Sequence, residues 1–131
     1  MSTTTKLIIL FICFVLSLVG FLIKIPVPLR GHDKFLHSAF YFLAAAFLNF
    51  LFRKKHVLIF VLLALFGVLI EYLQPLCNKL THSKIHGRFD IEDIYANMKG
   101  LVLYSVIALI FAGLRMALKA SGSNKHKSSD I

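Results

Sequence analysis

The most prominent pattern along this chain is a series of four apolar stretches separated by short polar segments. The stretches run from Leu7 to Ile23, from Phe35 to Phe52, from Val57 to about Leu76 and, opening near Asp90, from Leu101 to Leu114. Even the first, of about 17 residues, spans about 25 Å as a helix at about 1.5 Å per residue, which is enough to cross a bilayer. The pattern therefore predicts an all-α integral membrane bundle of four transmembrane helices.

Residues at the ends of the stretches indicate where the helices start and stop. Pro26 and Pro28 follow the first stretch and should terminate it, and no small-x-small cleavage site marks it as a signal peptide. Asp33 precedes the second stretch and is a plausible N-cap residue. Pro75 is expected to end the third helix.

Composition agrees with the membrane class and bounds the domain organisation. Of the residues, 58% are hydrophobic and only 16% are charged, which is too apolar for an ordinary soluble domain. Residues 1–119 are predicted to form one transmembrane domain. Residues 120–131, rich in Ser, Lys, Gly and Asn, are predicted to be a disordered basic cytoplasmic tail. Two cysteines provide neither a disulfide framework nor a zinc quartet.

The net charge of +9 is better explained by membrane topology and anionic head groups than by nucleic acid, because no nucleic-acid-binding pattern accompanies it. The connection from Arg53 to His56 is so short that the second and third spans must form an antiparallel hairpin. Basic residues are almost evenly divided between the two membrane sides, and the dense Arg53-Lys54-Lys55 turn favours a cytoplasmic location for both termini.

Five of the six carboxylates lie in three short clusters at the edges of the apolar stretches. A charge inside a membrane helix costs roughly 2.5 to 3.5 kcal/mol on insertion scales, so such residues need a partner, a wet cavity or a function. The order of the spans brings all three clusters to the same membrane face, where we expect a polar pocket. The clusters are Asp33-Lys34-x-x-His37, Glu71-x-x-Gln74 and Arg88-x-Asp90-x-x-Asp93-x-x-x-Asn97-x-x-Gly100.

The polar residues of the fourth helix share one stripe, which two interpretations explain. At about 100° per residue, Asp90, Asp93, Asn97 and Gly100 occupy one face that can point into a bundle, where Gly100 would let a neighbouring helix approach closely. Alternatively, Asp90 is only an N-cap and Asp93 only its capping-box partner. Asn97 lies deeper, so its amide needs a partner in a dry environment.

Glu71 lies inside the third span and shares a face with Gln74. It either pairs with a cation such as Lys34 or Arg88, which would lock the bundle, or carries a proton. Arg88 offers a planar fork for phosphate or carboxylate, and its alternative role is an ion pair with the nearby acids.

His37 follows Asp33 by four residues, so the two side chains project over the same patch and can bond to each other or contact a ligand. Although His37 could join Glu71, Asp90 and Asp93 in binding an ion, their spacing matches no established metal motif. The sequence therefore predicts no metal and no cofactor. Nucleophile, Walker and dinucleotide motifs do not occur in it.

In order, spacing and position, the three clusters resemble the VanZ-like family of small bacterial membrane proteins, over about Leu7 to Leu118. Two positions depart from the family pattern: Lys99 replaces a usual apolar residue, and Tyr104 replaces the second small residue often found four positions after Gly100. The resemblance implies a four-helix protein of the bacterial cytoplasmic membrane whose namesake is linked to teicoplanin resistance. It does not supply a biochemical activity.

The expected function is a polar pocket at the outer membrane face, in contact with membrane lipids, that binds a lipid-linked or anionic cell-envelope ligand. Such a protein would act in the cell-envelope or glycopeptide response. One alternative is a membrane enzyme for a lipid-linked envelope substrate, with His37 or Glu71 as general acid or base. Another is a small transporter, although carboxylates gathered at one face form no relay across the bilayer.

Overall fold

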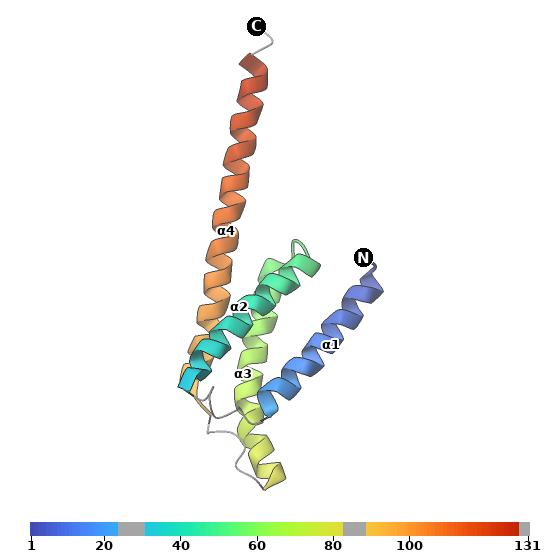
Figure 1. Ribbon diagram of the computed structural model, residues 1–131, viewed down its shortest axis with the longest axis vertical. Coiled ribbons are helices and arrows are strands. Elements are labelled where there is room, and N and C mark those ends of the chain that lie inside the picture. The colour runs from blue at the N-terminus through green and yellow to red at the C-terminus, as the bar shows by residue number, and fades with distance from the viewer. Residues whose placement is uncertain (24–30, 83–88, 129–131) are drawn as a thin grey trace.

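The computed structural model describes residues 1–23, 31–82 and 89–128. These residues form four α-helices, each containing a stretch long and apolar enough to cross a membrane (Figure 1). The prediction of an all-α bundle with four transmembrane helices is therefore confirmed, and the protein is a multi-pass membrane protein. The helices are α1 (Thr3–Leu22), α2 (Asp33–Leu51), α3 (His56–Thr81) and α4 (Ile91–Ser128).

The α2–α3 connection is a tight turn, as its length predicts. The Lys55 N–H donates to the carbonyl of Phe52, and Lys54 has a left-handed backbone with φ of 70°. In Figure 1 this turn lies towards the same end of the bundle as the N-terminus, and α4 extends past it in that direction. The start of α4 and the start of α2 therefore lie together at the opposite end, which is where the polar clusters were expected to meet.

The prediction that Pro75 ends the third helix is wrong. Helix α3 continues through Pro75 to Thr81, and His82 follows in a left-handed conformation with φ of 50°. A proline lacks the N–H that would bond to the carbonyl of Glu71, and its ring crowds that carbonyl, so a helix bends there more readily than it stops. Figure 1 shows the last turns of α3, in yellow, at an angle to its green body.

Helix α4 is longer than the sequence predicts. The backbone stays helical through Ser128, beyond residue 119, where the transmembrane domain was expected to give way to a disordered tail. No proline follows Lys119, so nothing removes the backbone donors needed to continue the helix. The side chains from Phe111 to Ser121 are exposed, and this part of α4 projects beyond the other helices (Figure 1).

The apolar core lies between α2, α3 and α4, whereas α1 buries no residue. Large hydrophobic side chains on the outer faces of all four helices are exposed. Exposed apolar side chains of this extent are solvated by lipid tails. The buried residues that pack together in the central cluster of the core are Tyr41, Ala45, Ile59, Leu63 and Leu101.

Helices α2 and α4 approach each other to backbone contact. A Cβ atom on Gly100 would lie 2.2 Å from the carbonyl oxygen of Ser38 and 3.1 Å from the backbone nitrogen of Phe42. The Ser38 hydroxyl donates to the Ala96 carbonyl at 2.8 Å. The close approach predicted at Gly100 is thus confirmed. Tyr104 packs its ring edge-on against Phe42, with centroids 5.9 Å apart, and so does not disturb the contact.

Candidate functional site

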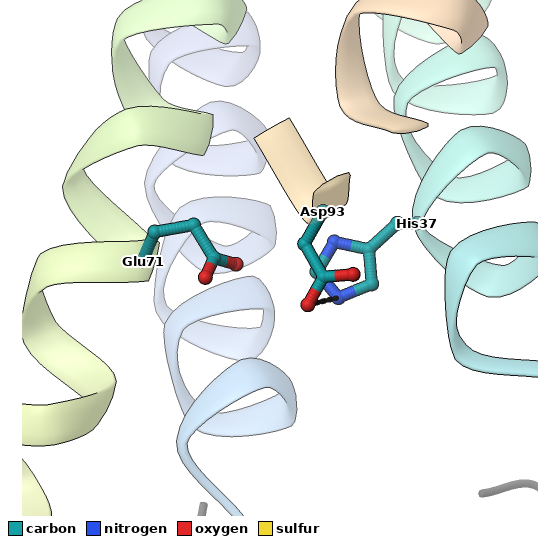
Figure 2. Close-up of side chains that lie close together, drawn as sticks. All are labelled: His37, Glu71 and Asp93. Carbon is teal, nitrogen blue, oxygen red and sulfur yellow. Dashed lines mark ion pairs between the residues drawn. The ribbon is translucent and has the colours of Figure 1, made fainter. Parts of the chain in front are cut away.

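Three titratable side chains from three helices meet inside the bundle. His37 comes from α2, Glu71 from α3 and Asp93 from α4, and one potential ligand atom of each lies within 4.8 Å of those of the others. Their exposed fractions are 5%, 0% and 8%, so the group is closed off from solvent. Figure 2 shows the carboxylate of Glu71 directed towards Asp93 and the imidazole of His37. The structure therefore brings together one residue from each polar cluster.

The orientation of the His37 ring is set by Asn97. The Asn97 side-chain oxygen lies 2.8 Å from His37 Nδ1, and because this oxygen can only accept, Nδ1 is the donor. In the neutral ring Nε2 then keeps its lone pair, and it lies 4.0 Å from Asp93 Oδ2. The need of Asn97 for a partner, inferred from its depth, is met on its oxygen side by this histidine.

Glu71 is fully buried and has no counter-charge among the ion pairs of the described residues. Its Oε2 accepts the Asp90 N–H at 3.3 Å, and its Oε1 has no hydrogen-bond partner. Lys34, one of its predicted partners, pairs with other carboxylates, and Arg88, the second, lies outside the described residues. An isolated buried carboxylate is unfavourable by several kcal/mol, so Glu71 requires a proton or a cation.

Asp90 caps α4 as the sequence predicts, but Asp93 is not its capping-box partner. The Glu92 N–H donates to Asp90 Oδ1 at 2.8 Å, while the Asp90 N–H is bonded to Glu71. This hydrogen bond from Glu92, together with the ammonium of Lys34, lowers the pKa of Asp90 below its ordinary value. Asp93 is therefore free to turn into the bundle towards His37.

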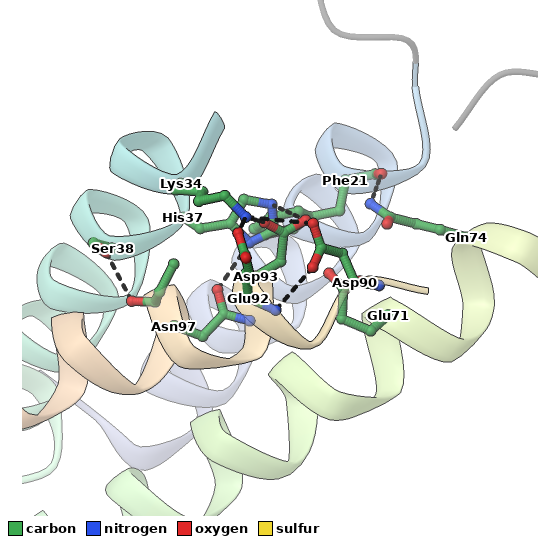
Figure 3. Close-up of polar contacts among 11 residues, drawn as sticks. Phe21, Lys34, His37, Ser38, Glu71, Gln74, Asp90, Glu92, Asp93 and Asn97 are labelled. Atoms are coloured by element: carbon green, nitrogen blue, oxygen red, sulfur yellow. Dashed lines mark hydrogen bonds and ion pairs between the residues drawn. The ribbon is translucent and has the colours of Figure 1, made fainter. Parts of the chain in front are cut away.

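Lys34 stands at the rim of the site and is shared by three carboxylates. Its Nζ lies 3.3 Å from Asp90 Oδ2 and 3.7 Å from Asp93 Oδ1, and it also contacts Glu92 (Figure 3). The Lys34 side chain is about half exposed, with 49% of its surface accessible. Since three acids already surround this ammonium, the described residues do not form a strongly cationic pocket.

Two further predicted residues take roles other than those expected. Gln74 donates from Nε2 to the carbonyl of Phe21 at 3.1 Å, and so ties α3 to the last turn of α1. Asp33 is the first residue of α2 rather than its cap, because His32 occupies the cap position without a side-chain hydrogen bond. Asp33 Oδ1 is buried without a hydrogen-bond partner, and His37 bonds through Nδ1 to Asn97. The negative charge of Asp33 still stabilises α2, because an acidic residue in the first turn interacts favourably with the helix dipole.

An open cavity of about 420 Å³ leads to the His37 side of the site. It lies between α1 and α2 and reaches α3 at Gln74. A Cβ atom on Gly20 would meet nothing within 4 Å, so the α1 wall has room at this point. We call this cavity the α1–α2 groove; it is lined by Leu16, Ser17, Gly20, Phe21, Leu36, His37, Phe40 and Gln74.

Gly67 and Tyr41, which lie next to the Asn97 side chain, were not predicted from the sequence to belong to the site. A Cβ atom on Gly67 would lie 2.8 Å from Asn97 Nδ2 and 3.2 Å from the hydroxyl of Tyr41, so any other residue would push these two side chains aside. The Tyr41 hydroxyl and Asn97 Nδ2 are buried without hydrogen-bond partners. A signal was present, since Gly67 precedes Glu71 by one helical turn and a glycine inside an apolar span often marks close packing.

Comparison of the chain with protein-family models, with curated proteins and with solved structures finds no match. The resemblance of the three polar clusters to the VanZ-like family therefore stays a prediction from sequence.

Proposed function

We propose that this protein binds a lipid-linked molecule, with the apolar part of the ligand in the α1–α2 groove and the polar part beside His37. The observation that carries the proposal is the groove itself, which combines an apolar lining with a polar end. Its volume of about 420 Å³ lies in the range of about 300 to 1,000 Å³ that is typical of small-molecule sites.

The arrangement of polar groups along the groove suits an amphiphile. Leu16, Phe21 and Phe40 supply apolar contacts, whereas His37 and Gln74 supply polar groups at one end. Because α1 buries no residue, the groove can admit a ligand from the surrounding lipid without disrupting the core of α2, α3 and α4. A lipid chain would thus exchange one apolar environment for another, and the head group would provide selectivity.

The head group that suits the described residues is one that donates hydrogen bonds or is held through a cation. Glu71 and Asp93 are buried carboxylates, and the ammonium of Lys34 is already surrounded by acids. An anionic group such as phosphate would be repelled by these carboxylates unless a positive charge lay between them. The expectation of an anionic ligand therefore depends on further cations, among which Arg88 is the sequence candidate.

The proposal includes the biological setting expected from sequence. The resemblance and the charge pattern together suggest three things. They are VanZ-like membership, an outward-facing polar site in the bacterial cytoplasmic membrane, and a part in the cell-envelope or glycopeptide response. Within that setting, lipid-linked cell-envelope molecules are the ligand class that meets both requirements of the groove, a long apolar chain and a polar head.

The test compares lipids that copurify with the wild-type protein and with a groove-filling variant. Gly20→Leu adds a side chain to the groove without a backbone clash, and Gly113→Leu adds the same side chain to α4 at a position that is equally open. After purification in mild detergent, mass spectrometry should find a lipid enriched over the bulk membrane with wild type and Gly113→Leu, and depleted with Gly20→Leu. A lipid profile that is the same for all three proteins would refute the proposal.

A second candidate function is catalysis on the same ligand class. His37, Glu71 and Asp93 form a buried group at the polar end of the groove, and such groups can transfer protons during hydrolysis or group transfer. Turnover of a lipid-linked substrate by purified protein should be lost in His37→Ala and Glu71→Gln. Turnover that persists in the double variant would exclude this function.

A further inference from the structure

We infer that His37, Glu71 and Asp93 form a binding site for one divalent transition-metal ion. Their potential ligand atoms lie within 4.8 Å of one another, and each residue comes from a different helix of the bundle core. In Figure 2 the side chains converge on a common point between α2, α3 and α4. This inference differs from the sequence-based expectation of no metal, because the ligands are brought together by tertiary structure and form no local motif.

Each of the two carboxylates has an oxygen atom that lacks the partner that buried carboxylates normally have. Glu71 Oε1 and Asp93 Oδ1 are both buried without a hydrogen bond, and Glu71 is 0% exposed. The nearest ammonium to Asp93 Oδ1, that of Lys34 at 3.7 Å, is shared with two other acids. A divalent cation held between the two carboxylates would balance their charges.

The tautomer of His37 is the one that a metal ligand requires. Its Nδ1–H is held by the Asn97 oxygen at 2.8 Å, which leaves the lone pair of Nε2 on the side of Asp93. Metal-bound histidines almost always donate their other ring N–H to a carbonyl or carboxylate in this manner. Asn97 therefore acts as a positioning residue, and Gly67 leaves the space that its amide occupies.

The three ligand atoms would have to move closer together to bind an ion of small radius. Donor atoms about 2.1 Å from a tetrahedral metal lie about 3.4 Å from one another, whereas Nε2 of His37 and Oδ2 of Asp93 are 4.0 Å apart. Binding would therefore require the carboxylates to turn inwards, because separations within the group reach up to 4.8 Å. One nitrogen and two carboxylate oxygens favour Zn²⁺ or Mn²⁺ over Mg²⁺ and Ca²⁺, which prefer oxygen ligands alone.

Three protein ligands would leave a coordination position for an exogenous group. His37 also lines the α1–α2 groove, so the metal site adjoins the groove on the side of this residue. The metal site itself rests on the three side chains and does not require the proposed lipid ligand. The two proposals can therefore succeed or fail separately.

The first experiment measures metal stoichiometry in the full-length protein, purified with its affinity tag removed and stripped with EDTA. After dialysis against Zn²⁺, wild type should retain one ion per chain, and His37→Ala and Glu71→Gln should retain none. The matched control is His56→Ala, because His56 Nδ1 bonds to the side-chain oxygen of Asn49 at 3.2 Å and belongs to no such carboxylate group. Zn²⁺ retention that is absent in wild type, or unchanged in His37→Ala, would overturn the inference.

A second experiment guards against variants that fail to fold. Co²⁺ bound to wild type should give a visible absorption spectrum that Zn²⁺ abolishes by competition. His37→Cys should retain Co²⁺ and add a thiolate-to-metal charge-transfer band, which a purely structural role of His37 would not produce. Asn97→Leu should weaken binding about 10- to 100-fold, and Asn97→Asp, which keeps an acceptor, should largely preserve it. Co²⁺ binding by His37→Cys without the new band would contradict direct ligation.

Discussion

Helix α2 contacts α4 through backbone atoms, whereas α1 contacts its neighbours mainly through side chains. Helices α2 and α4 touch through backbone at Gly100 and are joined by the hydrogen bond from Ser38 to Ala96. The described contacts of helix α1 are instead mainly aromatic, such as that of Phe21 with Phe40 at 4.9 Å between ring centroids, and include the hydrogen bond from Gln74. One interface fixes the polar site and the other leaves a groove beside it.

This difference separates two requirements of a membrane site. Buried carboxylates must be held by a rigid scaffold, because each lost partner leaves an uncompensated charge in a medium of low dielectric constant. A ligand that arrives from the bilayer, by contrast, needs a wall that can yield. The close α2–α4 pair meets the first requirement, and the α1 helix, which buries no residue, would meet the second for the proposed ligand.

The largest expected effect on stability comes from placing a side chain between α2 and α4, where they are in backbone contact. Gly100→Ala places a Cβ atom 2.2 Å from the Ser38 carbonyl oxygen, which belongs to the backbone and cannot move aside as a flexible side chain would. We expect a loss of about 3 kcal/mol in the free energy of unfolding, at the upper end of the usual overpacking range. Thermal or denaturant unfolding in detergent micelles measures it.

Gly113→Ala is the matched control, since it changes the same residue type in the same helix where a Cβ atom meets nothing within 4 Å. Its effect should be neutral or stabilising by up to about 1 kcal/mol, because alanine favours the helix. Equal stability of Gly100→Ala and Gly113→Ala would show that α2 and α4 are not in backbone contact.

An intermediate effect is expected at Gly67, behind the polar site. The Cβ atom of Gly67→Ala would lie 2.8 Å from Asn97 Nδ2 and 3.2 Å from the Tyr41 hydroxyl, and both are ends of side chains that can shift. The loss of stability should therefore be about 1 to 2 kcal/mol, less than for Gly100→Ala, and the Asn97 bond to His37 should weaken. Unfolding measurements together with the imidazole NMR signals of His37 test this, and an unchanged His37 signal would contradict it.

The helices and their closest approach could be predicted from the sequence better than the exact end of a helix could. The four spans were predictable because a lipid environment demands continuous apolar helices, and the approach at Gly100 was predictable because its spacing from Asn97 keeps both on one face. The course of α3 beyond Pro75 was not, since a proline can bend a helix as well as end it.

Within the site, the convergence of the three clusters followed from the order of the spans, but the individual partners did not. Glu71 bonds to the backbone of Asp90 and not to Lys34, and Gln74 bonds to α1 and not to the polar residues. Such choices depend on helix rotation and on distances of a few ångströms, which periodicity does not specify. Gly67 and Tyr41 were missed because their roles exist only in the packed bundle.

A smaller effect on stability is expected at the hydrogen bond that joins α3 to α1. Gln74→Leu removes the donor to the Phe21 carbonyl and keeps a side chain of similar size in the groove, so it should cost about 1 kcal/mol. The change should appear as faster amide hydrogen exchange in the last turns of α1, with little effect on α2 and α4. Ser105→Ala serves as control, since its hydroxyl bonds only to the Leu101 carbonyl within α4. Uniform exchange changes across all helices would contradict a local role.

The smallest effect is expected at Asp90, which lies at the exposed end of the close α2–α4 pair. Folding lowers its pKa below the ordinary 3.8, because the Glu92 N–H donates to its carboxylate and Lys34 lies nearby. A group whose pKa is lowered on folding stabilises the folded state above its ordinary pKa, and this contribution is lost as the pH falls through the folded pKa. Asp90→Asn keeps an N-cap acceptor but removes the charge.

Wild type should therefore be slightly more stable than Asp90→Asn at pH 7, and the difference should shrink below about pH 4 as Asp90 becomes protonated. Thermal unfolding of both proteins in the same detergent between pH 7 and pH 3 measures this difference directly. Added salt should also reduce it, since the partner Lys34 is about half exposed and its attraction to Asp90 is screened. A difference that stays constant with pH and salt would mean that the α4 cap depends on the geometry of the acceptor alone. The charge of Asp90 would then contribute nothing to the stability of the N-terminus of α4.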